Sequence, residues 1–116
     1  MLANVFFEHA ILELSTKNRD GLHIFFSEIV ATFGLIFVIF ATLKDGKTIV
    51  AISVATYISA GYWFTSSTSF ANPAVSIART FTDSFTGINY LNTPTYILAE
   101  FIGLILAAYI LKIIYK

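Results

Sequence analysis

Long apolar stretches separated by short polar segments dominate the pattern along the chain. Residues 22–43 are apolar with few interruptions, and residues 48–64 and 95–115 have the same character. A helix needs about 17–25 residues to cross a hydrocarbon core about 30 Å thick. Because each stretch reaches that length, the pattern predicts an all-α membrane protein with three transmembrane helices.

Polar residues mark the boundaries of these stretches. Residues 44–47 form a charged, glycine-containing turn between the first two spans, and residues 92–94 stop the chain before the third. The apolar stretch over residues 1–14 is too short to span a bilayer and is interrupted by charges. We therefore expect residues 1–21 to hold the remnant of another helix followed by an extramembrane loop.

The segment between the second and third spans breaks the pattern. A small, hydroxyl-rich stretch leads to Asn72 and Pro73, which indicate a helix start because asparagine is a strong N-cap and proline suits the first turn. Polar residues limit the helix to residues 73–84, about 18 Å and about half a bilayer. This predicts a re-entrant half-helix, which membranes tolerate where it packs in protein or lines an aqueous path. The alternative is a surface helix, with residues 65–92 lying on the membrane.

Composition narrows the class of protein. The 116 residues are 57% apolar and 12% charged, and seven basic residues balance seven acidic ones. Such a chain has too few charged residues to cover the surface of a soluble domain. Its net charge of zero does not indicate binding to nucleic acid. It has no cysteine and no spacing typical of a metal site, a catalytic triad or a phosphate loop. We therefore expect neither enzymatic activity nor a metal or other cofactor.

Lysine placement predicts the orientation in the membrane. If three helices alternate, the lysines of residues 44–47 and those after residue 111 share one side, where four basic residues face three on the other side. The second side also carries acidic residues that dilute its positive charge. The positive-inside tendency then places the turn at residues 44–47 and the C-terminus in the cytoplasm.

Several short motifs are similar to those of a known family. Residues 72–74 form an Asn-Pro-Ala box, and residues 27–34 place Glu28 early in the first span. Residues 62–67 and 77–83 flank the box with further matching positions. Together these motifs resemble the major intrinsic protein family, the aquaporins and glycerol facilitators, in a bacterial branch of that family.

The resemblance covers almost the whole chain but only the second of the family's two inverted repeats. It implies a single aquaporin-like half-channel domain over residues 1–116, in the inner membrane of a bacterium. Residues 2–15 are similar to the tail of the third helix of a complete channel. We therefore expect Met1 to correspond to a point inside such a channel.

The resemblance implies roles for residues around the box. Asn72 would direct its side-chain amide into the pore, and Pro73 and Ala74 would pack against a second Asn-Pro-Ala box. The family usually has an arginine directly after the box, where this chain has Val75. This departure leaves water and small neutral solutes such as glycerol as equal candidates. Arg79 lies one turn further on, where it either serves a filter set further outward or reaches the lipid headgroups.

Two carboxylates lie several residues inside predicted spans, where an isolated charge is costly. The resemblance implies that Glu28 accepts hydrogen bonds from backbone N–H groups of the connection before the half-helix. That role is structural, and proton relay is its alternative. For Glu100 we expect a position near the headgroups or a polar contact with another helix.

The sequence therefore predicts half of a passive channel for water or small neutral solutes such as glycerol. The implied partners are the lipid bilayer and either a complementary half-channel chain or further copies of this chain. Two other hypotheses stay open. One is a fragment or subunit of a secondary transporter, since transporters also use broken helices and membrane carboxylates. The other is a non-conducting accessory membrane protein.

Overall fold

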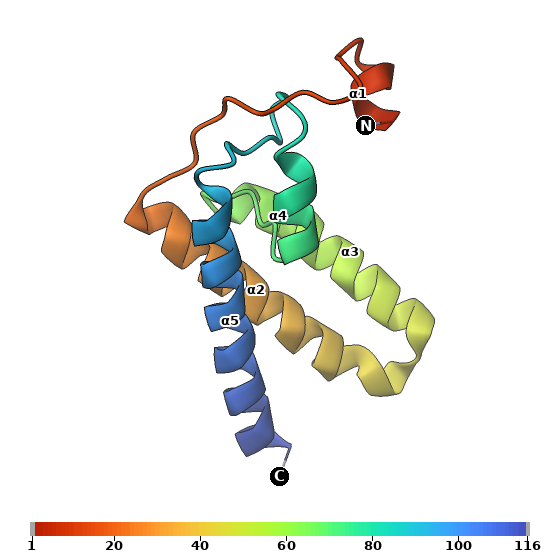
Figure 1. Ribbon diagram of the computed structural model, residues 1–116. Coiled ribbons are helices and arrows are strands. Elements are labelled where there is room, and N and C mark those ends of the chain that lie inside the picture. The colour runs from red at the N-terminus through yellow and green to blue at the C-terminus, as the bar shows by residue number, and fades with distance from the viewer. Residues whose placement is uncertain (1, 116) are drawn as a thin grey trace.

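The computed structural model describes residues 2–115, and within that range it consists of helices and irregular segments without a β-strand. Three long helices lie beside one another, and a much shorter helix packs near one end of them (Figure 1). The predicted all-helical fold class is confirmed. The elements are α1 (Leu2–Phe6), α2 (Leu22–Thr42), the 3-10 helix η1 (Leu43–Asp45), α3 (Lys47–Phe64), α4 (Pro73–Arg79) and α5 (Thr93–Ile114).

Within residues 2–115, two helical segments have the length and apolar composition needed to cross a membrane, namely Leu22–Asp45 and Thr93–Ile114. They correspond to α2 with η1, and to α5. Helix α3 has 18 residues, about 27 Å at 1.5 Å per residue, but its lysine, serine and threonine side chains make it less apolar. Its assignment as a third span stays a prediction. All three long helices differ from the predicted ranges by one or two residues at their ends.

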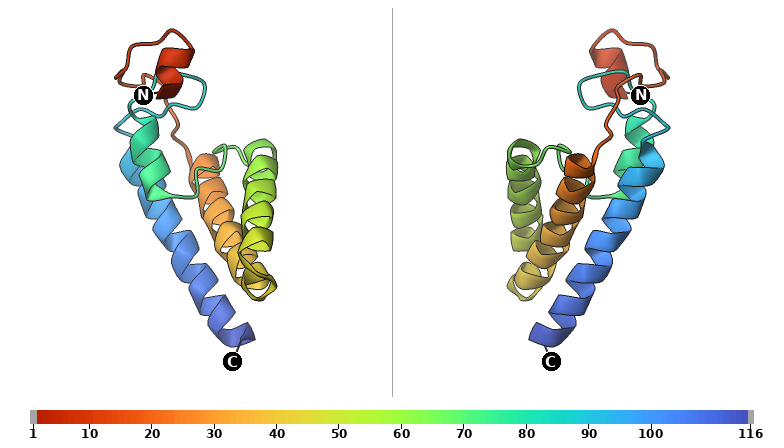
Figure 2. Two further views of the ribbon diagram at one scale, coloured as in Figure 1. Left: turned by 90° about the vertical axis from the view of Figure 1, so that its right-hand side faces the viewer. Right: turned by 90° about the vertical axis from the view of Figure 1, so that its left-hand side faces the viewer.

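The ends of the long helices lie at two opposite ends of the molecule (Figure 2). The turn between α2 and α3 lies at the same end as the C-terminal end of α5, and Lys44 Nζ lies 6.0 Å from the ring centroid of Tyr115. The N-terminal segment and the loop after α4 lie together at the other end. This arrangement agrees with three alternating helices, and it separates the lysine-rich end from the end that carries α4.

Helices α2 and α5 approach closely because Gly103 has no side chain. A Cβ atom added there would lie 2.6 Å from the carbonyl oxygen of Ile29 and 3.0 Å from Cβ of Thr32. The first of these neighbours is backbone and cannot rotate away. Small residues at such crossings let helix backbones come together in membranes.

Replacing Gly103 by valine is therefore expected to lower the free energy of unfolding by about 1–3 kcal/mol. Overpacking at this crossing forces α2 and α5 apart. The measurement is denaturation by sodium dodecyl sulfate in mixed micelles, followed by circular dichroism. Ile105→Val, on a side chain that is 65% exposed, is the control and should change the free energy little. Equal stabilities of the two variants would contradict this account of the crossing.

Helix α4 is shorter than predicted, because it ends at Arg79 and not at residue 84. The carbonyl groups at its end accept hydrogen bonds from distant segments. Ile88 N–H donates to the Arg79 oxygen at 3.3 Å, and Ser15 N–H donates to the Thr80 oxygen at 2.9 Å. These bonds replace the ones that would continue the helix, and they join α4 to the loop behind it and to the N-terminal segment.

The N-terminal helix is also shorter than the helix remnant predicted over residues 2–15. Helix α1 covers Leu2–Phe6. His9 N–H donates to the Asn4 oxygen at 2.7 Å, and Glu8 takes the left-handed conformation with φ of 59°. The chain therefore turns out of the helix here and continues as an irregular segment to α2.

Candidate functional site

The connection between α3 and α4 has an unusual backbone. Thr68, Ser69 and Ala71 have φ angles of 63°, 51° and 52°, in the left-handed region that residues with a Cβ adopt only at a cost. Such a conformation persists only where the surrounding structure holds it. The contacts of this connection with the rest of the protein therefore hold its backbone in this conformation.

A carboxylate from α2 holds the end of the connection. Glu28 is 0% exposed, and its Oε2 accepts a hydrogen bond from Phe70 N–H at 3.3 Å. Its Oε1 accepts a second bond from Ala71 N–H. Among the described residues, no basic group lies within 4.0 Å of this carboxylate. The hydrogen bonds that this carboxylate accepts come from backbone N–H groups of the connection.

A second carboxylate, from α5, continues the same pattern. Glu100 is 1% exposed, and its Oε1 accepts from Asn72 N–H at 3.2 Å and from the Ser76 hydroxyl at 2.6 Å. Of the two positions expected for Glu100, the structure shows the polar contact with another helix. Three consecutive backbone N–H groups, of residues 70–72, thus donate to two carboxylates from two long helices. The expectation for Glu100 did not identify α4 as its partner.

Asn72 begins α4 as its N-cap. Its Oδ1 accepts from Ala74 N–H at 2.9 Å, and its carbonyl oxygen accepts from the N–H groups of Val75 and Ser76 at 3.0 Å each. Pro73 in the first turn has no N–H to satisfy. With Oδ1 occupied, the Nδ2 amide of this exposed residue is the donor that remains for another group.

An apolar groove opens beside the start of α4. It measures about 270 Å³, and Asn72 and Pro73 form part of its wall. Glu100 and Thr32 also line it, and each has a buried oxygen without a hydrogen-bond partner among the described residues. The apolar lining comes from α2 and α5, with Leu35, Ile36 and Ile39 on α2 and Phe101 and Leu104 on α5.

The remaining predicted site residues are spread along α4. Ala74 is exposed, and Val75 is half-buried against the cluster that contains Phe70 and Tyr96. Arg79 lies at the far end of α4, where Cζ of its guanidinium is 4.2 Å from the ring centroid of Phe70. The structure thus gathers Glu28, Asn72 and Pro73 at the start of the helix and leaves Arg79 at the other end.

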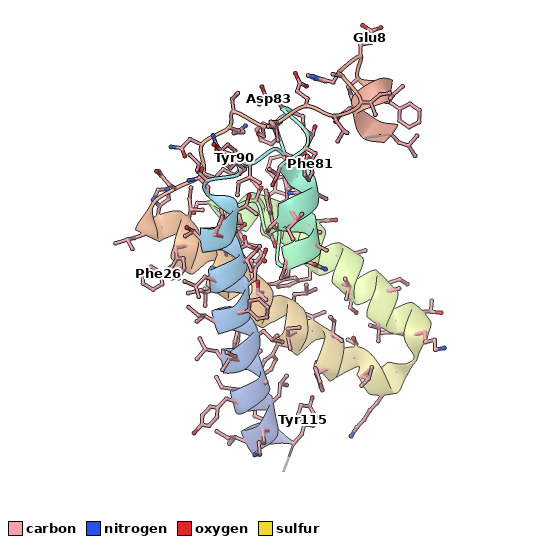
Figure 3. The ribbon with its side chains drawn as sticks, in the orientation of Figure 1. Glu8, Phe26, Phe81, Asp83, Tyr90 and Tyr115 are labelled. Atoms are coloured by element: carbon pink, nitrogen blue, oxygen red, sulfur yellow. The ribbon has the colours of Figure 1, made fainter. Side chains whose placement is uncertain are left out.

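The loop after α4 is tied to the N-terminal segment. Asp83 Oδ1 accepts from the backbone N–H of Thr16 at 2.8 Å and from its hydroxyl at 3.0 Å. These bonds hold the pKa of Asp83 below its ordinary value. Figure 3 shows Asp83 on this loop at the end of the molecule that carries Glu8, with Tyr115 at the opposite end.

Arg19 is a residue of this end that sequence reasoning missed. It lies in the N-terminal segment, is buried, and donates from Nε to the Gly87 oxygen at 2.7 Å and from Nη2 to the Phe85 oxygen at 2.8 Å. Its Cζ lies 5.3 Å from the ring centroid of Phe70. In the sequence Arg19 resembles any solvated loop arginine, and no local pattern distinguishes it.

The chain is similar to a curated bacterial protein. The chain is 42% identical over 111 residues to aquaglyceroporin AqpS of Rhizobium meliloti (strain 1021), and the aligned region covers 96% of the chain and 48% of that protein. The chain thus spans about half the length of this curated relative. No family model and no solved structure matches the chain. This similarity and the apolar helices identify an integral membrane protein.

Proposed function

Since the chain is related in sequence to the major intrinsic protein family, we propose that it forms one half of a passive transmembrane channel for water or small neutral solutes such as glycerol. The observation that carries the proposal is the broken backbone before α4, where two buried carboxylates accept from three consecutive N–H groups. At membrane depth such a break is tolerated where the segment packs in protein or lines an aqueous path, and the exposed Asn72 at the end of this buried connection favours the path. The relationship to an aquaglyceroporin also favours a channel over an enzyme.

In this proposal the Nδ2 amide of Asn72 contacts the passing solute. The neighbouring N–H groups of residues 70–72 and 74–76 all donate to acceptors within the chain. The Nδ2 amide of Asn72 is therefore the donor that remains free. It can replace a hydrogen bond that a water molecule or a solute hydroxyl loses when it leaves bulk water and enters the path. A neutral donor serves neutral solutes and offers nothing to a cation.

The depth of the break supports the same interpretation. Glu28 lies six residues after the first residue of α2, and Glu100 lies seven residues after the first residue of α5. At 1.5 Å per residue these positions are about 9–11 Å along each helix, well inside a hydrocarbon core about 30 Å thick. We propose that α2, α3 and α5 span the inner membrane of a bacterium, with the lysine-rich end in the cytoplasm.

The proposal includes a second half. Within the described residues, α4 is the one helix that begins at such a break, and the groove beside Asn72 is open to its surroundings. Val75 occupies the position where the family usually has arginine, which supports a wider path than that of a strict water channel. The other half is a complementary half-channel chain or a further copy of this chain.

Stopped-flow swelling of phosphatidylcholine vesicles tests this function. With the chain alone, glycerol and water permeability should stay near that of empty vesicles, because one half-helix leaves the path unclosed. Adding a chain that carries the first half of aquaglyceroporin AqpS should raise glycerol permeability at least about tenfold over empty vesicles, whether or not a proton gradient is present.

Three results would change the account. High permeability with the chain alone would show that copies of this chain complete the path together. Permeability that stays at the vesicle background with the complement present would overturn the channel proposal, provided that both chains are in the membrane. Transport that collapses with the proton gradient would favour the transporter hypothesis.

A further inference from the structure

A cavity of about 480 Å³ lies beyond the far end of α4 from Asn72, and most of its surface is apolar, with Phe7, Ala78 and Phe85 in its wall. It is partly open and is bounded by the end of that helix, the loop that follows it and the N-terminal segment, which lie together in Figure 1. None of the contacts that hold the break before α4 involves it. Its polar lining consists of the side chains of Asn4, His9, Arg79, Thr82, Ser84 and Thr86.

Arg79 brings a positive charge without an ionic partner to this cavity. Its Nη1 is buried and has no hydrogen-bond acceptor among the described residues. The guanidinium packs against the ring of Phe70, which offers a favourable face to a cation but no oxygen. A charged group that lacks acceptors is costly to bury, and a ligand oxygen in the cavity would supply one to the half-buried guanidinium.

A second guanidinium strengthens the positive potential here. Arg19 lies over the same ring, and its own donors are used by the carbonyl groups of Phe85 and Gly87. Those bonds fix the loop that carries Ser84 and Thr86. Arg19 therefore shapes the cavity wall and adds charge, and the ligand-binding donors come from the other side chains.

The acidic side chains of this end do not neutralise Arg79. Glu13 pairs with His9 at 3.0 Å, and the carboxylate of Asp83 accepts from Thr16. Glu8 and Asp20 are exposed. Within the described part of the chain, no carboxylate oxygen lies within 4.0 Å of the Arg79 guanidinium.

A chain of hydroxyl groups faces the same cavity. The Thr82 hydroxyl donates to Asn4 Oδ1 at 2.6 Å and lies 3.1 Å from Ser84 Oγ. Ser84 Oγ in turn lies 3.2 Å from Thr86 Oγ1. Hydroxyl groups rotate to donate or accept as a ligand requires, so Ser84 and Thr86 can turn their protons toward an oxygen held by Arg79.

We propose that this cavity binds a small oxyanion, held by the guanidinium of Arg79 and by the hydroxyl groups of Ser84 and Thr86. Guanidinium groups suit carboxylate, sulfate and phosphate oxygens because their planar fork makes charge-assisted bonds. The shared chemistry is a compact group of negatively charged oxygens, on an organic acid or an inorganic ion. This site uses residues of the chain alone, so it stands independently of the channel proposal.

The test is a titration of the isotope-labelled full chain in phosphatidylcholine nanodiscs, followed by nuclear magnetic resonance. The probes are acetate, its neutral counterpart acetamide, and sulfate. Acetate or sulfate should shift the Arg79 side-chain signal and the amides of Ser84 and Thr86 saturably. Acetamide should bind at least about tenfold more weakly, because it lacks the charge. Saturation by acetate alone identifies carboxylates, and saturation by sulfate alone identifies inorganic oxyanions.

Two variants of Arg79 and one control variant assign the effect to the cavity. Arg79→Gln should abolish the saturable shifts, and Arg79→Lys should retain part of the affinity because it keeps the charge. Lys47→Gln removes an exposed cation from the opposite end of the molecule and should leave binding unchanged. If Arg79→Gln loses the dispersed amide spectrum of a folded protein, Arg79→Lys is compared with the wild type instead. Three outcomes would overturn the proposal: equal affinity for acetate and acetamide, no saturation by either anion, or equal anion binding in the wild type and in Arg79→Lys.

Discussion

Replacing Glu28 by alanine is expected to collapse the break before α4 and to abolish solute flux through the assembled channel. The change leaves the N–H groups of Phe70 and Ala71 buried without acceptors. Each buried donor without a partner costs about 1–3 kcal/mol, a large part of the 5–15 kcal/mol by which proteins are typically stable. The left-handed residues of the connection add a cost that the lost bonds no longer offset.

The expected loss has two readouts. Denaturation in mixed micelles should show a free energy of unfolding lower by about 2–6 kcal/mol, from the two donors together, and glycerol permeability should fall to the vesicle background. Glu13→Gln is the matched control, since it removes a carboxylate from an exposed pair with His9. Wild-type stability and flux in the alanine variant would show that Glu28 does not hold the break.

Exchanging Asn72 for aspartate is expected to lower glycerol permeability at least about tenfold while the fold is kept. Aspartate is as good an N-cap as asparagine, so the bond from Ala74 N–H to Oδ1 persists. The Nδ2 donor, however, is replaced by a negatively charged acceptor. A neutral solute then loses its donor, and a charge at a constriction attracts cations to the path.

The control is a variant with the same asparagine-to-aspartate substitution at a different position. Asn18→Asp places an equal charge on an exposed residue of the N-terminal segment and should leave glycerol permeability unchanged. Circular dichroism and denaturation should show both variants folded like the wild type. If Asn72→Asp conducts glycerol as well as Asn18→Asp does, the amide of Asn72 does not contact the passing solute.

The features that the sequence predicted well are local ones. Membrane-length apolar stretches define α2, α3 and α5 to within one or two residues, because hydrophobicity over about 20 residues needs no distant partner. The start of α4 at Pro73 follows from its cap and proline in the same way. Glu28 stands out in the sequence because a carboxylate inside an apolar span requires a partner.

The features that the sequence did not predict depend on contacts between distant segments. Helix α4 ends early because Ile88 and Ser15 donate to its last carbonyl groups. Glu100 shares a helix with many apolar residues, and its partner Asn72 lies 28 positions away. Arg19 acquires its role only when the loop after α4 folds over it. No periodicity or spacing encodes such pairings.

The depth of α4 in the bilayer tests the central claim most directly. The chain has no cysteine, so Ala74→Cys supplies a single site for a spin label next to Asn72. Power saturation in the assembled channel should place this label about 10 Å or more below the headgroups and find it accessible to a water-soluble relaxation agent. A label at Lys47→Cys marks the headgroup level. If the Ala74 label lies at that same level, α4 is a surface helix and the channel account is contradicted.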